Sequence, residues 1–228
     1  MAQKKQIFEH KPAWQENAWR DISLRKKQKG DLMKIVFKGK YSGNPADIPN
    51  EGHRPNAVMF KEPDMNKMAL VMNIAAFIVT AVLLVATFVR AKGIDRSDGL
   101  QIIIGAVCSM LVLFPHELLH AICFKKTAYV YTNLRQGMLF VTGGEDMSKA
   151  RFVIMSLLPN IVFGFVPFIL YMAIPTYTAL GVFGSICIGQ GAGDYLNVYN
   201  ALTQMPKGSK TYLYETHSYW YMPEDNNQ

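Results

Sequence analysis

The chain has 228 residues, 50% of them apolar, and a formal net charge of +7. Residues 1–67 hold fourteen of the 24 Lys and Arg, whereas long inner stretches hold none, and this pattern is typical of an α-helical membrane protein. Positive charge beside membrane segments explains the excess, and the sequence contains no nucleic-acid-binding motif, so we expect the lipid bilayer and no nucleic acid as a partner.

Residues 1–67 predict a basic cytoplasmic N-terminal region. The segment begins with Lys and Glu and lacks the short apolar run of a secretory leader, so we expect no cleaved signal peptide. Residues 32–37 predict one short strand or an interfacial segment, and residues 41–56, rich in Pro, Gly and Asn, predict an irregular linker. All three cysteines of the chain lie in apolar segments, which argues against a disulfide framework.

Four apolar segments predict an α-helical integral membrane domain over residues 68–200, followed by a cytoplasmic C-terminal tail over residues 201–228. A helix needs roughly 20 residues to cross a bilayer, and each segment reaches that length. The third contains Pro159 and Pro167, which predict a bend or an interruption. The four predicted transmembrane helices span residues 68–90, 99–124, 152–174 and 177–199.

The distribution of Lys and Arg predicts the orientation of these helices, because cytoplasmic segments carry the excess of positive charge. With both termini inside, the cytoplasmic segments hold fourteen, five and two Lys and Arg. The outer connections hold only Arg90, Lys92 and Arg96. We therefore expect a multi-pass protein of the cell membrane whose N-terminus and C-terminus are cytoplasmic.

The second predicted helix carries an HExxH pattern near its cytoplasmic end. His116 and His120 are four residues apart, so on a helix both imidazoles project from one face and can reach one zinc ion. Glu117 lies about 100° further round the turn, where it is free to act as a catalytic base. Core histidines that bond to backbone carbonyls are the alternative. Placing three polar side chains in an otherwise uncharged membrane helix costs free energy, so their presence together favours the metal site.

A zinc ion held by two histidines needs at least one more protein ligand. Asp194 is the only acidic residue of the fourth predicted helix and lies at the same depth as the histidines, so we expect it to be that ligand. Gln190 and Asn197 share its polar face and are predicted to hydrogen-bond to the ligands. Glu145 and Cys123 remain alternatives for completing the metal site.

The fourth predicted helix also carries a ridge of small residues, which recur every four positions and let another helix approach closely. In the simpler interpretation, this ridge only packs helices and Asp194 is a polar pin between them. The ridge consists of Gly181, Ser185, Gly189 and Gly193.

Residues 128–142 predict a β-hairpin, because two runs of β-branched and aromatic residues flank a short loop that contains Gly137. An exposed edge of this hairpin is able to hold an unwound substrate as an added strand. An ordinary hairpin on the membrane surface is equally compatible with the pattern. Asn160 follows the helix-breaking Pro159 and is a candidate for positioning substrate, or for satisfying carbonyls that the proline frees. The aromatic run over residues 212–221 alternates like a strand.

Three motifs together resemble the bacterial putative zincin peptidase family, a group similar to the site-2 intramembrane zinc metalloproteases. They are the pattern at residues 116–120, the Ser-Leu-Leu-Pro-Asn turn at residues 156–160, and the Gly-Asp-Tyr-Leu-Asn run at residues 193–197. The resemblance covers roughly residues 100–200. It implies Zn²⁺ bound by two histidines and Asp194, with Glu117 activating a water. The Asn-Pro-Asp-Gly-like motif of the site-2 proteases is absent.

We therefore expect a membrane-embedded zinc metallopeptidase that hydrolyses peptide bonds of a membrane-associated peptide or protein near the cytoplasmic interface. The alternative is a non-catalytic multi-pass membrane protein, such as a scaffold, an accessory subunit or an inactive peptidase relative, with a structural metal or none. The sequence does not name the substrate or the oligomeric state.

Overall fold

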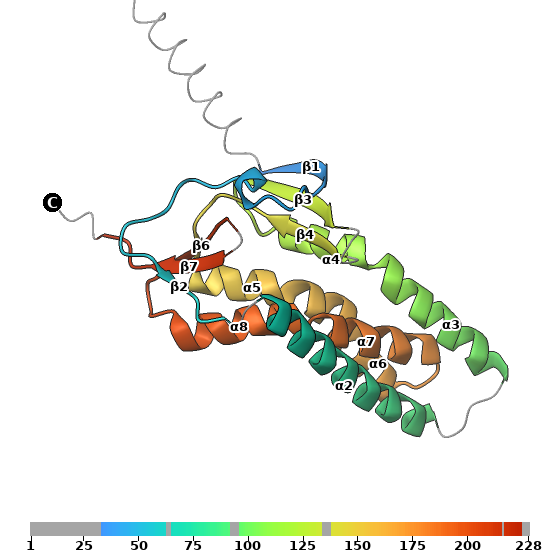
Figure 1. Cartoon of the computed structure of the whole chain (residues 1–228). Coiled ribbons are helices and arrows are strands. Elements are labelled where there is room, and N and C mark those ends of the chain that lie inside the picture. Colours follow the sequence, from blue (N-terminus) through green and yellow to red (C-terminus); the bar gives the residue numbers. More distant parts are fainter. Residues whose placement is uncertain (1–32, 63–64, 92–95, 134–137, 216, 225–228) are drawn as a thin grey trace, which may run out of the picture.

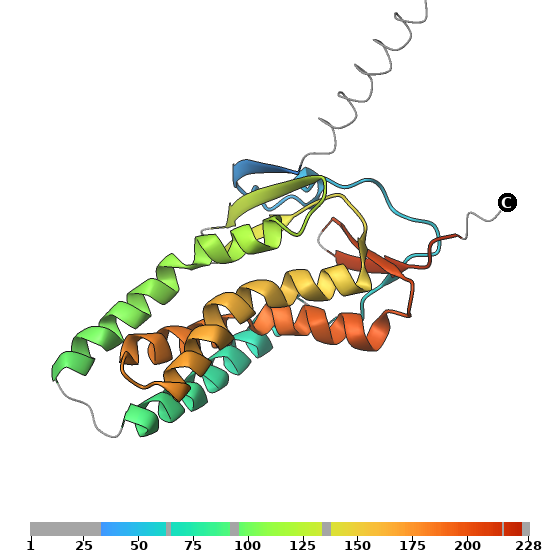
Figure 2. The ribbon, with the colours of Figure 1, turned by 180° about the vertical axis from the view of Figure 1, so that it is seen from behind.

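The computed structural model describes residues 33–62, 65–91, 96–133, 138–215 and 217–224. Its helices form an elongated bundle, and two small β-sheets lie at one end of that bundle (Figures 1 and 2). The first half of the predicted basic region and the loop of the predicted hairpin fall outside the described residues.

Within the described residues, three helical segments are long and apolar enough to cross a membrane. Their outer surfaces are strongly apolar: Phe77 and Val89 of the first segment are each 74% exposed. A surface of this kind suits a lipid environment better than water. The segments are Lys67–Ala91 in α2 (Met65–Ala91), Asp98–Ala121 in α3 (Arg96–Leu111) and α4 (Leu113–Ala121), and Lys149–Ala173 in α5 (Lys149–Pro159) and α6 (Val166–Ala173).

The single helix predicted over residues 177–199 is divided in the structure. It consists of α7 (Thr178–Gln190) and α8 (Ala192–Gln204), which meet at Gly191. Glycine weakens a helix because its backbone loses the most conformational freedom on ordering. The apolar α7 has only 13 residues, fewer than the three segments above, and the chain continues in the more polar α8.

Helix α7 lies at the centre of the bundle and contacts α2, α3 and α6 (Figure 2). The small-residue ridge makes this possible. A Cβ at Gly181 would lie 2.7 Å from the Thr87 side chain of α2, and one at Gly189 would lie 2.8 Å from the Ala76 carbonyl of the same helix. Ser185 is fully buried and hydrogen-bonds to Thr87 at 3.1 Å. Gly193, the last member of the predicted ridge, faces open space.

The bend predicted in the third segment is a local change of helix type. Helix α5 ends at Pro159, and residues Asn160–Phe165 form a π-helical turn (η2) before α6 begins. Pro167 occupies the first turn of α6, where its missing N–H is tolerated. Single π-turns inside α-helices are frequent at functional sites, and this one begins at Asn160.

The first sheet has the strand order β1-β3-β4, which makes β4 an edge strand. β1 (Lys34–Lys40) pairs parallel with β3 (Thr127–Asn133), and β3 pairs antiparallel with β4 (Met138–Thr142). This antiparallel pair lies where the sequence predicts a hairpin, and β1 overlaps the short strand predicted over residues 32–37.

The second sheet has the order β2-β7-β6-β5 and joins distant parts of the chain. The aromatic C-terminal segment supplies its two longest strands, which pair antiparallel with each other and with two short strands from earlier in the chain. Beside this sheet, Phe60, Ala201 and Met205 form a buried cluster that fixes the end of α8. The strands are β2 (Val58–Met59), β7 (His217–Tyr221), β6 (Lys210–Tyr214) and β5 (Met147–Ser148).

A second buried cluster fixes the end of α4 between the sheets. Ala121 and Phe124 at the end of α4 pack with Ala128 of β3 and Met147 of β5. Because α4 carries the HExxH pattern, these contacts hold the pattern at the junction between the helical bundle and the two sheets.

Candidate metal centre

Helix α4 is a short helix set off from α3 at Val112, and Pro115 explains the break. A proline has no backbone N–H, so the carbonyl four residues earlier, that of Leu111, loses its helical partner. Regular bonding resumes at once, because the N–H of His116 donates to the Val112 carbonyl at 2.8 Å. The motif therefore follows a local break in a helical run that extends over Asp98–Ala121.

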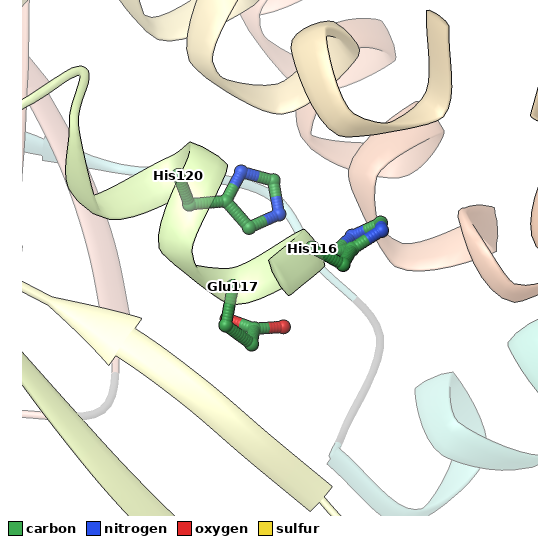
Figure 3. Close-up of side chains that lie close together, drawn as sticks. All are labelled: His116, Glu117 and His120. Carbon is green, nitrogen blue, oxygen red and sulfur yellow. The ribbon is translucent and has the colours of Figure 1, made fainter. Parts of the chain in front are cut away.

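His116, Glu117 and His120 project from α4 toward the interior of the molecule (Figure 3). The two imidazole rings lie 4.9 Å apart, measured between their centroids, as the four-residue spacing predicts. Potential ligand atoms of the three residues all lie within 4.8 Å of one another. His120 is buried and His116 is half-buried.

Asp194, in the first turn of α8, lies against both histidines. Its Oδ2 is 3.2 Å from Nε2 of His116, and its Oδ1 is 3.3 Å from Nε2 of His120. The carboxylate side chain is 14% exposed. The fold thus brings together two helices that are far apart in the sequence, and one carboxylate and two imidazole nitrogens converge on one point.

The chemistry and spacing of these donors fit one zinc ion. Zn–N and Zn–O bonds of about 2.0–2.2 Å at tetrahedral angles separate neighbouring donor atoms by roughly 3.3–3.6 Å. The two nitrogen-to-oxygen distances at Asp194 are 3.2 and 3.3 Å. Two histidines and one carboxylate are also a donor set of catalytic zinc sites, which leave the fourth position open.

A backbone carbonyl sets the tautomer of His120. Its Nδ1 donates a hydrogen bond to the Met155 carbonyl of α5 at 2.8 Å. Because Nδ1 carries the proton, the lone pair of Nε2 is free to bind a metal, and the ring is held in one orientation. The sequence pattern does not reveal this contact, since a backbone carbonyl carries no signature of residue type.

Asn160 holds the carboxylate of Asp194. The side chain is 1% exposed, and its Nδ2 donates to Asp194 Oδ2 at 2.7 Å and to the Ser156 carbonyl at 3.0 Å. Gly191 makes room for this amide: a Cβ at that position would overlap the Asn160 Oδ1 and lie 2.6 Å from its Cγ. Asn160 was expected to lie near the site, but the requirement for Gly191 was not predicted.

Glu117 faces β4 rather than α8. Its carboxylate lies close to the backbone N–H of Val141. Val141 belongs to the edge strand of the first sheet. The predicted base therefore lies between the histidine pair and the free edge of β4.

The other predicted residues lie elsewhere. Gln190 is exposed at the end of α7, and Asn197 lies one turn beyond Asp194, half-buried in the wall of a cavity. The hydrogen bond to Asp194 that was predicted for these two residues is made by Asn160 instead. Within the part of the chain that the structure describes, neither Gln190 nor Asn197 is hydrogen-bonded to the Asp194 carboxylate.

The two alternative ligands already have other partners. Glu145 is buried, pairs with Arg151, and accepts hydrogen bonds from the backbone N–H groups of Lys125 and Lys126 at 2.9 and 2.7 Å. Cys123 directs its thiol to the Leu119 carbonyl at 3.5 Å. The cluster of potential metal ligands consists of His116, Glu117 and His120, so it contains neither of these residues; Asp194 is also outside it and is supported by its distances to the two histidines.

Residues 109–210 match a family model described as putative zincin peptidase. The match covers the whole centre, including α4, the π-turn and α8, and it confirms the resemblance that the sequence motifs indicate. No curated protein and no solved structure gives a significant match to the chain.

Proposed function

From the match of residues 109–210 to a family of zincin peptidases, we propose that this protein is a membrane-embedded zinc metallopeptidase that hydrolyses peptide bonds near the cytoplasmic interface. The observation that carries the proposal is the convergence of His116, His120 and Asp194: the Asp194 carboxylate oxygens lie 3.2 and 3.3 Å from Nε2 of the two histidines on the other helix. The similarity of this protein to the site-2 intramembrane proteases is part of the same proposal.

In this mechanism His116, His120 and Asp194 hold the metal. A zinc ion there supplies a Lewis acid, which makes water nucleophilic near neutral pH and polarises a substrate carbonyl. Glu117 takes a proton from the attacking water and returns it to the leaving amine. The nearby backbone N–H of Val141 helps to orient the Glu117 carboxylate beside the pair of histidines.

The substrate lies as an extended strand along the free edge of β4. A peptide bond inside a helix is shielded by its own hydrogen bonds, so an unwound segment is needed for hydrolysis. β4 is an edge strand, and its Val141 contacts the base directly. A strand added there passes Glu117 while main-chain hydrogen bonds hold it in place.

The metal content of purified variants tests the site. We expect one zinc per chain in the wild type and in Glu117→Gln, and little zinc in His116→Ala or Asp194→Ala. Turnover of fluorescence-quenched apolar peptides is expected to disappear in Glu117→Gln. The matched control is His217→Ala, which removes an exposed histidine of β7 and keeps both properties.

Two results would contradict this mechanism. Unchanged cleavage by Glu117→Gln would exclude Glu117 as the catalytic base. A wild-type protein without zinc would favour a non-catalytic membrane protein. A zinc-loaded protein whose activity is insensitive to Glu117 would indicate a structural metal.

The membrane orientation is part of the same proposal: the three long apolar segments and the shorter α7 cross the bilayer, and these four crossings leave both sheets and both termini in the cytoplasm. It is supported by three apolar helical segments and by the concentration of Lys and Arg in the segments that flank the sheets. A membrane-impermeant maleimide applied to intact cells should label a cysteine introduced at Lys92 and spare one introduced at Lys207. The reverse pattern would refute this orientation.

A further inference from the structure

We infer that a cavity beside the metal centre receives one apolar side chain of the substrate, of about the size of leucine or phenylalanine. This inference rests on the proposed peptidase function and adds the class of residue that the enzyme selects. The cavity has a volume of about 170 Å³ and lies where the ends of α4 and β4 meet α5, α8 and β6. Its apolar walls include Phe124, Val141, Met147, Phe152, Met155 and Leu213.

Two wall residues contact the catalytic side chains directly. The backbone N–H of Val141 lies close to the Glu117 carboxylate, and the Met155 carbonyl accepts the Nδ1–H of His120 at 2.8 Å. Only one wall residue therefore separates the cavity from Glu117, and one other separates it from the metal ligand His120. A strand that passes Glu117 along β4 reaches this cavity within one or two residues of the bond to be cleaved, because strand residues are spaced about 3.3 Å apart.

The volume and the walls decide which side chain fits. An apolar cavity of about 150 Å³ is large enough to bind benzene, so a space of this size accepts one phenyl or leucyl group. The one acidic side chain in the wall, Glu145, is already paired with Arg151 and with two backbone N–H groups. A basic substrate side chain thus finds no free counter-charge there. The exposed wall is mainly apolar and therefore favours apolar groups, although it also contains uncharged polar residues: Thr142, Asn197, Thr211, Tyr212 and Ser218.

Ser218 gives a way to fill the cavity without touching the catalytic residues. It lies on β7 directly opposite Leu213 of β6, and both residues line the cavity. Directly paired residues share one face of a sheet, so a leucine at position 218 projects beside Leu213 into the same space. Ser218→Ala is the matched control, because it removes the hydroxyl without adding volume.

The experiment measures kcat/KM of the full-length protein for fluorescence-quenched apolar peptides. The peptides form a series in which each position around the cleaved bond is varied in turn among Ala, Leu, Phe and Lys. We expect one position at which Leu and Phe exceed Ala by on the order of 10–100-fold, since each methylene in an apolar pocket contributes substantially to discrimination. Ser218→Leu is expected to reduce this preference to less than about 3-fold, because it lowers kcat/KM for the Leu and Phe peptides more than for the Ala peptide. Ser218→Ala is expected to keep the wild-type preference.

A second measurement separates this inference from the peptidase proposal. Fluorescence anisotropy reports binding of the same peptides to Glu117→Gln protein, with and without Ser218→Leu, and needs no turnover. If the wild type cleaves none of the peptides, the proposed function fails, and binding alone decides the inference. The inference is supported if Leu peptides bind more tightly than Ala peptides and Ser218→Leu abolishes this difference. An equal preference with and without Ser218→Leu, in cleavage or in binding, overturns it.

Discussion

Gly191 separates α7 from α8 and touches the amide that holds Asp194, so Gly191→Ala is a sharp test of how the centre is built. The added Cβ would overlap Asn160 Oδ1 and lie 2.6 Å from Asn160 Cγ, well inside van der Waals contact. Asn160 is 1% exposed and has no open space into which it can retreat. The amide must therefore turn away, and its 2.7 Å hydrogen bond to Asp194 is lost.

The expected cost has two parts. Overpacking a buried site destabilises a protein by about 1–3 kcal/mol. Loss of a side chain that orients a metal ligand lowers metal affinity by about 10–100-fold. That factor corresponds to about 1.4–2.7 kcal/mol of zinc binding free energy. Zinc affinity should fall because Asp194 loses the partner that keeps its carboxylate turned toward the two histidines.

Competition with a zinc-chelating dye measures the affinity, and thermal unfolding measures the stability. The matched control is Gly193→Ala, two residues further along, where an added Cβ meets nothing within 4 Å. We expect this variant to bind zinc like the wild type and to keep or raise its stability, because alanine favours a helix over glycine.

Asn160→Ala completes the test, because it removes the hydrogen bond without a clash. Its zinc affinity should fall to the level of Gly191→Ala. The double variant should bind zinc no more weakly than Asn160→Ala alone, since residues that act through one contact are not additive. If Gly191→Ala binds zinc as tightly as Gly193→Ala, Asn160 does not position Asp194 and the reasoning is refuted.

The two alternative ligands give the remaining prediction, read by zinc content and thermal unfolding. Glu145→Gln should keep one zinc per chain but lower the free energy of unfolding by about 1–3 kcal/mol, because it leaves the partly buried Arg151 without its carboxylate. Cys123→Ala should change neither property appreciably, since the thiol only contacts the Leu119 carbonyl. Loss of zinc in either variant would show that this residue, and not Asp194 alone, completes the site.

Sequence alone determined the local features of this protein. The four-residue spacing of His116 and His120 places both rings on one side of any helix, and the rings do lie 4.9 Å apart. The length of an apolar run likewise fixes how much of a bilayer a helix can cross, and three such segments are present. Both properties depend only on residues close together in the chain. Local sequence also suggested Asp194 as the third ligand, because the direction of its helix, inferred from the Lys and Arg distribution, placed it at the same depth in the membrane as the histidines.

Tertiary structure alone decided which side chains meet. Asn160 bonds to Asp194, whereas Gln190, which shares a helical face with Asp194 in an unbroken helix, is exposed because the chain breaks at Gly191. The rotation of one helix against another depends on close packing at positions such as Gly181 and Gly189, not on periodicity within either helix. For the same reason, the sequence could not show that the free edge of β4 lies against Glu117, or that a cavity opens beside it.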